Sequence, residues 1–171
     1  MINKILVPAI AKSAELQQIW KEHYYTQEMF YCQGGEYYHP LSINENNDYG
    51  QYAYAVIDND KIIGYISYYW NCNSRSVTRF MIISFDKGNP NFGIALHMLK
   101  KEIISRNPHR IEWRMVGGNP VEEFYDKIIK QYNGRKILLR DGTIDKTGHY
   151  LNDYIYEIIM EDNNEKYGSS I

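Results

Sequence analysis

The chain has 171 residues, of which 44% are hydrophobic and 23% charged, so it can bury a core and is not expected to be disordered. Its net charge of −2 argues against a general nucleic-acid-binding protein, and its apolar stretches are too short to span a bilayer. We therefore expect one domain over residues 1–161, followed by a charged tail over residues 162–171 that frays.

A strand and a helix are the first elements predicted. The stretch ILVPAIA, residues 5–11, contains a proline and is flanked by lysines, so we interpret it as a strand rather than a signal peptide. Ser13 can then cap a helix whose apolar residues follow a helical period: Leu16, Ile19, Trp20 and Tyr24. Residues 26–50 are polar, aromatic and broken by glycine and proline, which is typical of a long functional loop.

Three consecutive strands follow this loop. Residues 51–70 read as two strands joined at Asp58–Asp60, whose turn chemistry predicts a β-hairpin. Residues 76–85, SVTRFMIISF, predict a third strand that leads into the loop and helix NPNFGIALHMLKK. Pro108 ends this helix, whose apolar face consists of Phe92, Ala95, Leu96, Leu99 and Ile103.

A second helix is expected between two later strands. After RIEWRMV, residues 110–116, Asn119 can act as N-cap, with Pro120 at the first helical position and Glu122 completing a capping box. Tyr125 lies at the margin of the helical face that we expect to be apolar, formed by Val121, Phe124, Ile128 and Tyr132.

Two closing strands complete the chain. They cover residues 135–144 and 149–160 and flank a turn at Asp145–Gly148. The resulting order, β-α-loop-β-β-β-α-β-α-β-β, predicts one mixed α/β domain.

Cysteine and histidine usage indicates neither disulfides nor metal. Cys32 and Cys72 are the only cysteines, so reduced thiols in a cytoplasmic protein are expected. The five histidines show no close metal-ligand spacing, and we predict no metal. A composition rich in Asn, Ile, Lys and Tyr and poor in Arg is typical of an AT-rich bacterial genome.

Charge is distributed unevenly along the chain. Residues 22–60 hold seven carboxylates and no lysine or arginine, whereas residues 61–140 hold fourteen basic residues against six acidic ones. The first region could attract a cation and the second an anion such as a phosphorylated cofactor. The alternative is that these charges are solvated surface groups without a partner.

Three segments carry a resemblance to a known family. They are the hairpin sequence KIIGYIS, the strand, loop and helix FMIISFDKGNPNFGIALHML, and NPVEEFYDKI followed by GRKILLRDGTIDKTGHYLNDYIYEI. Over residues 51–160 the chain resembles the GNAT superfamily of acyl-CoA-dependent N-acetyltransferases. The resemblance implies a GNAT-like, mixed but mostly antiparallel central sheet of six to seven strands flanked by helices.

It also implies acetyl-CoA as co-substrate. The family's loop motif, Q/R-x-x-G-x-G/A, falls on residues 90–95: Gly93 and Ala95 match, and Pro90 replaces Gln or Arg. Such a loop holds diphosphate on backbone N–H groups at a helix N-terminus, and proline has none. Each lost contact costs about 1.5–3 kcal/mol. The cofactor-binding residues implied are Asn91, Phe92, Gly93, Ile94 and Ala95.

Further site residues follow from the same resemblance. Tyr125 would lie near the thioester sulfur and protonate the departing thiolate, for which a phenol of pKa about 10 is well matched. Asn119 would contact the cofactor, although it lies six residues before Tyr125 where the family has seven, and capping alone can explain it. The strand before the loop would splay from its neighbour and offer backbone groups to the pantetheine arm at Ile83, Ser84 and Phe85.

The acceptor is expected to be an amine. The acidic region would form the acceptor side of the cleft, and carboxylates with aromatic faces suit a small cationic amine or a lysine side chain. Its tyrosines, several of which can instead fill the core, are Tyr24, Tyr25, Tyr31, Tyr37, Tyr38, Tyr49, Tyr52 and Tyr54. Glu112 and Glu28 are candidate general bases, and we assign neither.

Two alternatives to this enzyme stay open. The chain could be a non-catalytic GNAT-like module that binds acyl-CoA, a metabolite or a protein, which Pro90 and the missing base favour. Acetylation of charged tRNA is disfavoured by the near-neutral net charge. The aromatic-rich surface is compatible with a homodimer.

Overall fold

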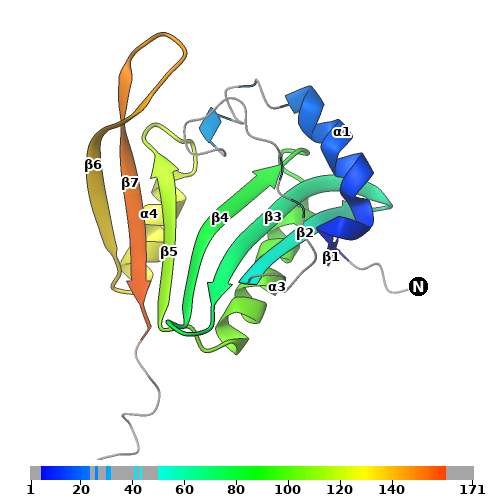
Figure 1. The fold of residues 1–171 in the computed structure, drawn as a ribbon, viewed down its shortest axis with the longest axis horizontal. Helices are drawn as coiled ribbons and strands as arrows, with labels where there is room; N and C mark the ends of the chain where they lie inside the picture. Colours follow the sequence, from blue (N-terminus) through cyan, green and yellow to red (C-terminus); the bar gives the residue numbers. More distant parts are fainter. Residues whose placement is uncertain are drawn as a thin grey trace, which may run out of the picture.

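The structure, a computed structural model, describes residues 5–23, 26, 30–31, 41, 43 and 50–160. Its elements follow the predicted order (Figure 1). The helices are the 3-10 helix η1 (Ala9–Lys12), α1 (Ser13–His23), α3 (Pro90–Ser105) and α4 (Glu122–Gln131). The strands are β1 (Leu6–Pro8), β2 (Gln51–Asp58), β3 (Lys61–Asn71), β4 (Ser76–Ser84), β5 (Arg110–Val116), β6 (Arg135–Ile144) and β7 (Tyr150–Ile159).

All seven strands form one sheet, in the order β1-β2-β3-β4-β5-β7-β6. Every neighbouring pair is antiparallel except β4 and β5, which are parallel. The mixed, mostly antiparallel sheet predicted from the sequence is therefore confirmed.

The two sharp turns of the sheet form where turn residues predict them. Asn59 and Asp60 join β2 to β3 and have φ values of 46° and 65°, the left-handed pair that a two-residue hairpin requires. Between β6 and β7, the Gly148 N–H donates to the Asp145 carbonyl, and Asp145 Oδ1 accepts the Thr147 N–H at 2.8 Å. Local chemistry was therefore sufficient to predict both turns.

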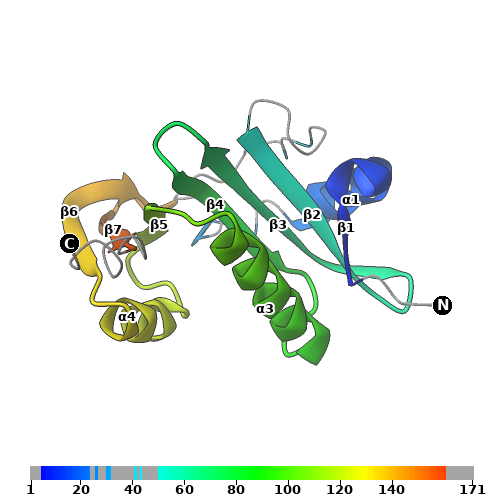
Figure 2. The same ribbon diagram turned by 90° about the horizontal axis from the view of Figure 1, so that it is seen from below.

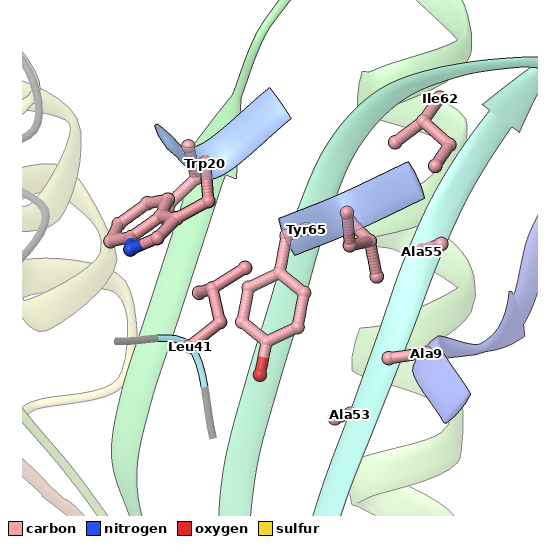
Figure 3. Close-up of a cluster of buried hydrophobic side chains, with 9 residues drawn as sticks. Ala9, Trp20, Leu41, Ala53, Ala55, Ile62 and Tyr65 are labelled. Atoms are coloured by element: carbon pink, nitrogen blue, oxygen red, sulfur yellow. The ribbon is translucent and has the colours of Figure 1, made fainter. Parts of the chain in front are cut away.

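Helices cover both faces of the sheet. Figure 2 shows α1 on one face and α3 and α4 on the other. Under α1, Trp20 and Leu16 pack on alternate residues of β2 and on Tyr65, in the buried cluster of Figure 3. Under α3, a second cluster gathers around the buried helix residues Ala95, Leu99 and Ile103. A third, beneath α4, contains Met115, Ile129, Tyr156 and Ile158.

Strands β4 and β5 meet at one end only. Their parallel pairing is limited to Ser76 with Arg110 and Val77 with Ile111. Beyond these two pairs the strands diverge, as Figure 1 shows. The edge of β4 that faces β5 is therefore unpaired with β5 from Thr78 onward, and the splay expected from the sequence is present.

Three local expectations need correction. The first strand ends at Pro8, because proline has no N–H to continue the ladder, and residues 9–12 form η1 instead. Helix α4 begins at Glu122, two residues after Pro120. Val121 and Phe124, both expected on its apolar face, are 40% and 54% exposed, whereas Tyr125 packs inward against the cluster beneath α4.

No helix among the described residues is long and apolar enough to cross a membrane. The tail over residues 162–171 lies outside the described residues, and the domain bounds 1–161 stay a prediction.

Candidate functional site

The unpaired edge of β4 carries the three residues expected along a pantetheine arm. The Phe85 N–H donates to the Ile63 carbonyl at 2.9 Å, and Ile83 faces Tyr65 in the same antiparallel ladder. Because backbone groups alternate in direction along a strand, Ile83 and Phe85 turn theirs toward β3. Ser84, between them, turns its backbone groups toward β5 and the open edge.

The first turn of α3 is closed by its own cap. Asn89 is the N-cap, and its Oδ1 accepts the Asn91 N–H at 3.0 Å. The Phe92 N–H donates to the Asn89 carbonyl at 3.1 Å, and Pro90 has no N–H. The donors that the loop motif would offer to a diphosphate are thus wound into helix or capped, because the helix begins two residues before Phe92.

Two carboxylates surround this cap. Asn89 Nδ2 donates to Asp58 Oδ2 and to Asp86 Oδ2, each at 3.0 Å, and Asn91 Nδ2 donates to Asp58 Oδ1 at 2.8 Å. Asp58 comes from the end of β2 and Asp86 from the loop after β4. The positive end of the helix dipole is therefore already near two anions of the chain itself.

The other residues of the loop motif have mixed positions. Phe92 packs against the sheet, since a Cβ on Gly64 would lie 2.3 Å from its ring. Ala95 is buried in the core beneath α3. Gly93 is exposed with open space around it, and Ile94 is 47% exposed. Of the residues implied to bind the cofactor here, Gly93 and Ile94 face solvent, as does Pro90 at the start of α3.

Asn119 and Tyr125 lie on the other side of the splay. Asn119 Oδ1 accepts the Val121 N–H at 3.1 Å, so its side chain stabilises the turn that precedes α4. The half-buried ring of Tyr125 meets Trp113 and Tyr156 edge-on, with centroid distances of 5.5 and 5.7 Å.

A compact ion cluster lies beside Tyr125. Lys136 Nζ donates to Glu122 at 2.8 Å and to Asp126 at 2.9 Å, and the Tyr156 hydroxyl donates to Asp126 at 3.0 Å. Burial alone would lower the pKa of Lys136, but these carboxylates raise it above its usual value. The hydrogen bond from Lys136 in turn lowers the pKa of Asp126. Burial raises the pKa of Tyr156.

The candidate base Glu112 is engaged elsewhere. It forms an ion pair with Arg110, which also pairs with Glu157 across β5 and β7. Glu28, the other candidate, lies outside the described residues. No base is assigned.

Two of the tyrosines expected on the acceptor side lie beneath α3 instead. Tyr52 stacks on Tyr68 at 5.1 Å and carries the Arg106 guanidinium 4.0 Å above its ring. The hydroxyls of Tyr54 and Tyr68 both donate to Glu102 Oε1. Alternation along β2 explains the error, because residues 52 and 54 face α3 while Ala53 and Ala55 face α1.

Only Tyr31 of the remaining acceptor-side tyrosines is described. Its hydroxyl lies 3.5 Å from the position that a Cβ on Gly118 would take, at the end of β5. Tyr24, Tyr25, Tyr37, Tyr38 and Tyr49 lie outside the described residues.

A pocket that the sequence did not predict opens at this end of β5. Its volume is about 410 Å³, and its lining includes Gly117, Gly118, Asp141 and Tyr154. The available signal was the Asp-Gly pair inside the strand sequence RKILLRDGTI, since glycine within a strand often marks a bulge.

Solved structures with the same architecture come from several bacteria. An N-acetyltransferase from Staphylococcus aureus Mu50 superposes with a TM-score of 0.65 at 13% identity, covering 91% of this chain and 98% of that one. A probable acetyltransferase of the GNAT family from Chromobacterium violaceum gives a TM-score of 0.62 at 13% identity, covering 92% and 88%. The chain has the GNAT fold.

A third protein of this fold is a ribosomal-protein-alanine N-acetyltransferase from Brucella melitensis, with a TM-score of 0.62, 14% identity and coverage of 92% and 100%. No protein-family model matches the sequence, and no curated protein matches it. The likeness is thus one of fold.

The residues of this site suit one part of acyl-CoA, the pantetheine arm, but not another, the diphosphate. The open edge of β4 suits the amide groups of a pantetheine arm, because unpaired strand groups can donate and accept. The first turn of α3 does not suit a diphosphate as it stands, since its donors are used and two carboxylates lie beside it. No group of three metal-ligating side chains occurs within the described ranges, and the prediction of no metal is not tested.

Proposed function

We propose that this protein transfers an acetyl group from acetyl-CoA to a primary amine, either a small cationic amine or a lysine side chain. The observation that carries the proposal is the divergence of β4 from β5 in a GNAT fold, which leaves a strand edge open for a thioester arm. The acetyltransferases of this fold described above support it.

Acetyl-CoA would supply the activated thioester. Ser84 would bind the pantetheine arm through its backbone. Tyr125 would act as general acid and return a proton to the departing sulfur, since its basicity as a phenolate is close to that of a thiolate. The rings of Trp113 and Tyr156 fix the orientation of the Tyr125 side chain for this role.

Binding of the diphosphate on α3 would require the Asn89 cap to open. The Asn91 N–H becomes available only when Asn89 Oδ1 leaves it. The loop motif also implies the backbone N–H groups of Gly93 and Ile94, which lie inside the helix, and the carboxylates of Asp58 and Asp86 oppose an anion there.

This closed helix start favours a second candidate function, a GNAT-fold module that binds an acyl-CoA, a metabolite or a protein without catalysis. It differs from the first in one observable, because such a module releases no thiol from acetyl-CoA with any amine.

The deciding experiment combines calorimetric titration of acetyl-CoA and free CoA with a thiol-release assay over cationic, neutral and anionic amines. If the protein is an acetyltransferase, acetyl-CoA should bind with micromolar affinity and cationic amines should release thiol from it. Thiol release with neutral or anionic amines alone would exclude the cationic acceptor, and binding without release would favour the module.

Tyr125 has a test of its own. Tyr125→Phe should lower kcat about 10–100-fold while acetyl-CoA affinity holds, because only the proton donor is lost. Tyr132→Phe, a half-buried tyrosine of the same region whose ring faces Lys100, is the matched control. An unchanged kcat in Tyr125→Phe would remove Tyr125 from the mechanism.

A further inference from the structure

Strand β6 contains a bulge that faces β7. Its register against β7 shifts between Leu139 and Thr143, which leaves Arg140, Asp141 and Gly142 outside regular pairing. Asp141 has a φ of 50°, in the left-handed region. A Cβ on Gly142 would lie 2.7 Å from Asp153 Oδ2, so glycine is required for the close approach.

The bulge is anchored by a buried carboxylate. Asp153 is fully buried and accepts from the Thr143 hydroxyl at 2.9 Å and from Arg114 Nη2. Arg114 Nη2 also lies 3.4 Å from the Gly142 carbonyl. These bonds join β5, β6 and β7, so the bulge is a defined feature that holds Asp141 in one place.

Asp141 lines the pocket at the end of β5. The other groups that matter there are Gly117, Gly118, Asn152, Tyr150 and Tyr154. Gly117 lets the chain pass close to β7, because a Cβ there would lie 2.9 Å from the Asn152 carbonyl oxygen. The pocket, of about 410 Å³, is thus lined by one carboxylate, that of Asp141, and by the phenol rings of Tyr150 and Tyr154.

The charge balance at this pocket is negative. Asp141 makes no ion pair within the part of the chain that the structure describes. The nearby cations are already paired: Arg114 with Asp153, and Lys136 with Glu122 and Asp126. Lys136 Nζ lies 4.2 Å from the centroid of the Tyr154 ring, so one face of this ring already carries a cation of the chain itself. Arg140 is exposed and does not line the pocket.

We infer that this pocket binds a protonated primary amine, with the ammonium group between the Asp141 carboxylate and the rings of Tyr150 and Tyr154. A carboxylate gives a charge-assisted hydrogen bond, and aromatic faces add cation–π attraction. The site is separate from the N-terminal acidic region, where the sequence placed the acceptor. That the bound amine is the acetyl acceptor rests on the proposed function; the binding itself does not.

Its position relative to Tyr125 fits an acceptor. Gly118 directly precedes Asn119. The Tyr154 ring lies 6.4 Å from that of Tyr156, which lies 5.7 Å from that of Tyr125. A chain of ring contacts therefore connects the pocket to the proposed acid.

The test is calorimetric titration of the full chain, without acyl-CoA, with 1,5-diaminopentane and with 1,5-pentanediol. The two probes have the same length and differ in charge. The diamine should bind and the diol should not, and added salt should weaken the diamine. Equal binding of both probes, or of neither, would overturn the inference.

Asp141→Asn is the decisive variant, because asparagine tolerates the same left-handed backbone and removes only the charge. Diamine affinity should fall about tenfold. Glu123→Gln, an exposed carboxylate of α4 outside the pocket, is the matched control and should bind as wild type. Equal affinities in the two variants would overturn the site.

The two proposals can fail separately. Diamine binding that depends on Asp141, with no thiol release from acetyl-CoA, would refute acetyl transfer and leave the amine site intact. Thiol release with a KM for diamine unaffected by Asp141→Asn would retain the enzyme and refute this pocket as its acceptor site.

Discussion

The first turn of α3 and the bulge of β6 contain similar groups but differ in whether a carboxylate is left available to a ligand. Each combines carboxylates with a break in regular backbone geometry. At α3, Asp58 and Asp86 are satisfied by the amides of Asn89 and Asn91, and the turn is closed. At the bulge, Asp153 takes the internal donors, and Asp141 remains available in a pocket.

The difference shows what decides whether a carboxylate is structural or available. Local sequence is similar, since both sites contain Asp with Gly or Asn within a few residues. What differs is whether another element supplies donors within hydrogen-bond distance. A GNAT fold can therefore close the site expected for an anion and open a different one for a cation.

The largest expected effect comes from breaking the anchor of the bulge. Arg114→Met removes the countercharge of the fully buried Asp153 and leaves Thr143 as its side-chain partner among the described residues. Because Arg114 is itself 51% exposed, the loss should be about 2–3 kcal/mol rather than the full cost of a buried pair. Urea denaturation measures it.

Arg140→Met is the control for this variant. Arg140 is exposed and makes no ion pair within the described residues, so its unfolding free energy should change by less than about 0.5 kcal/mol. If both variants unfold at the same urea concentration as wild type, Asp153 does not hold the bulge through Arg114.

The second-largest effect is expected from removing the negative charges beside the first turn of α3, which should strengthen anion binding there. The double variant Asp58→Asn with Asp86→Asn removes both negative charges beside the helix start while keeping side-chain size. Acetyl-CoA should bind about tenfold more tightly by calorimetry, at a cost of about 0.3–1 kcal/mol in stability per lost helix–anion interaction.

Asp60→Asn provides the comparison for charge alone. Asp60 lies in the same hairpin turn as Asp58, is exposed, and makes no hydrogen bond to Asn89 or Asn91. An affinity gain of the same size in Asp60→Asn would mean that general repulsion, and not the closed cap, limits acetyl-CoA binding.

Periodicity and turn chemistry were enough to predict the elements of the sheet. The bounds of β5 and β6 agree with the sequence patterns, and the Asp58–Asp60 turn is where its residues predict it. These features depend on contacts between near neighbours in the chain, which the sequence displays directly.

The candidate site could be predicted only in part. That Pro90 removes a donor follows from the sequence, but the meeting of Asn89 with Asp58 depends on how α3 crosses the ends of β2 and β3. The side of α4 that is buried depends on its packing against Met115 and Tyr156 from other elements, which the helical period alone does not show. The residues that line the pocket with Asp141 come from β7 and from the turn after β5, and no local pattern places these segments beside the bulge.

The smallest effect tests the last turn of α3, where a carboxylate is again satisfied by other elements. Glu102 Oε1 accepts from Tyr54, Tyr68 and Arg106. Burial acts to raise the pKa of Glu102, but these hydrogen bonds outweigh it and the pKa lies below the usual 4.5. A depressed carboxylate pKa contributes stability above the unfolded value, and this stability is lost as pH falls through the folded value.

Glu102→Gln should therefore be less stable than wild type by about 1 kcal/mol at pH 6, because its amide faces donors with a donor of its own. The difference should begin to shrink below pH 4.5, where the Glu102 carboxyl of the unfolded wild-type chain becomes protonated, and should be lost as pH falls through the lower pKa of the folded state. Urea denaturation between pH 3 and 6 measures it, with the exposed Glu123→Gln as control. If the difference in unfolding free energy stays constant over this pH range, Glu102 contributes through packing and not as a charge. The comparison between hydrogen-bonded carboxylates and the available Asp141 would then depend only on Asp58 and Asp86 at the first turn of α3.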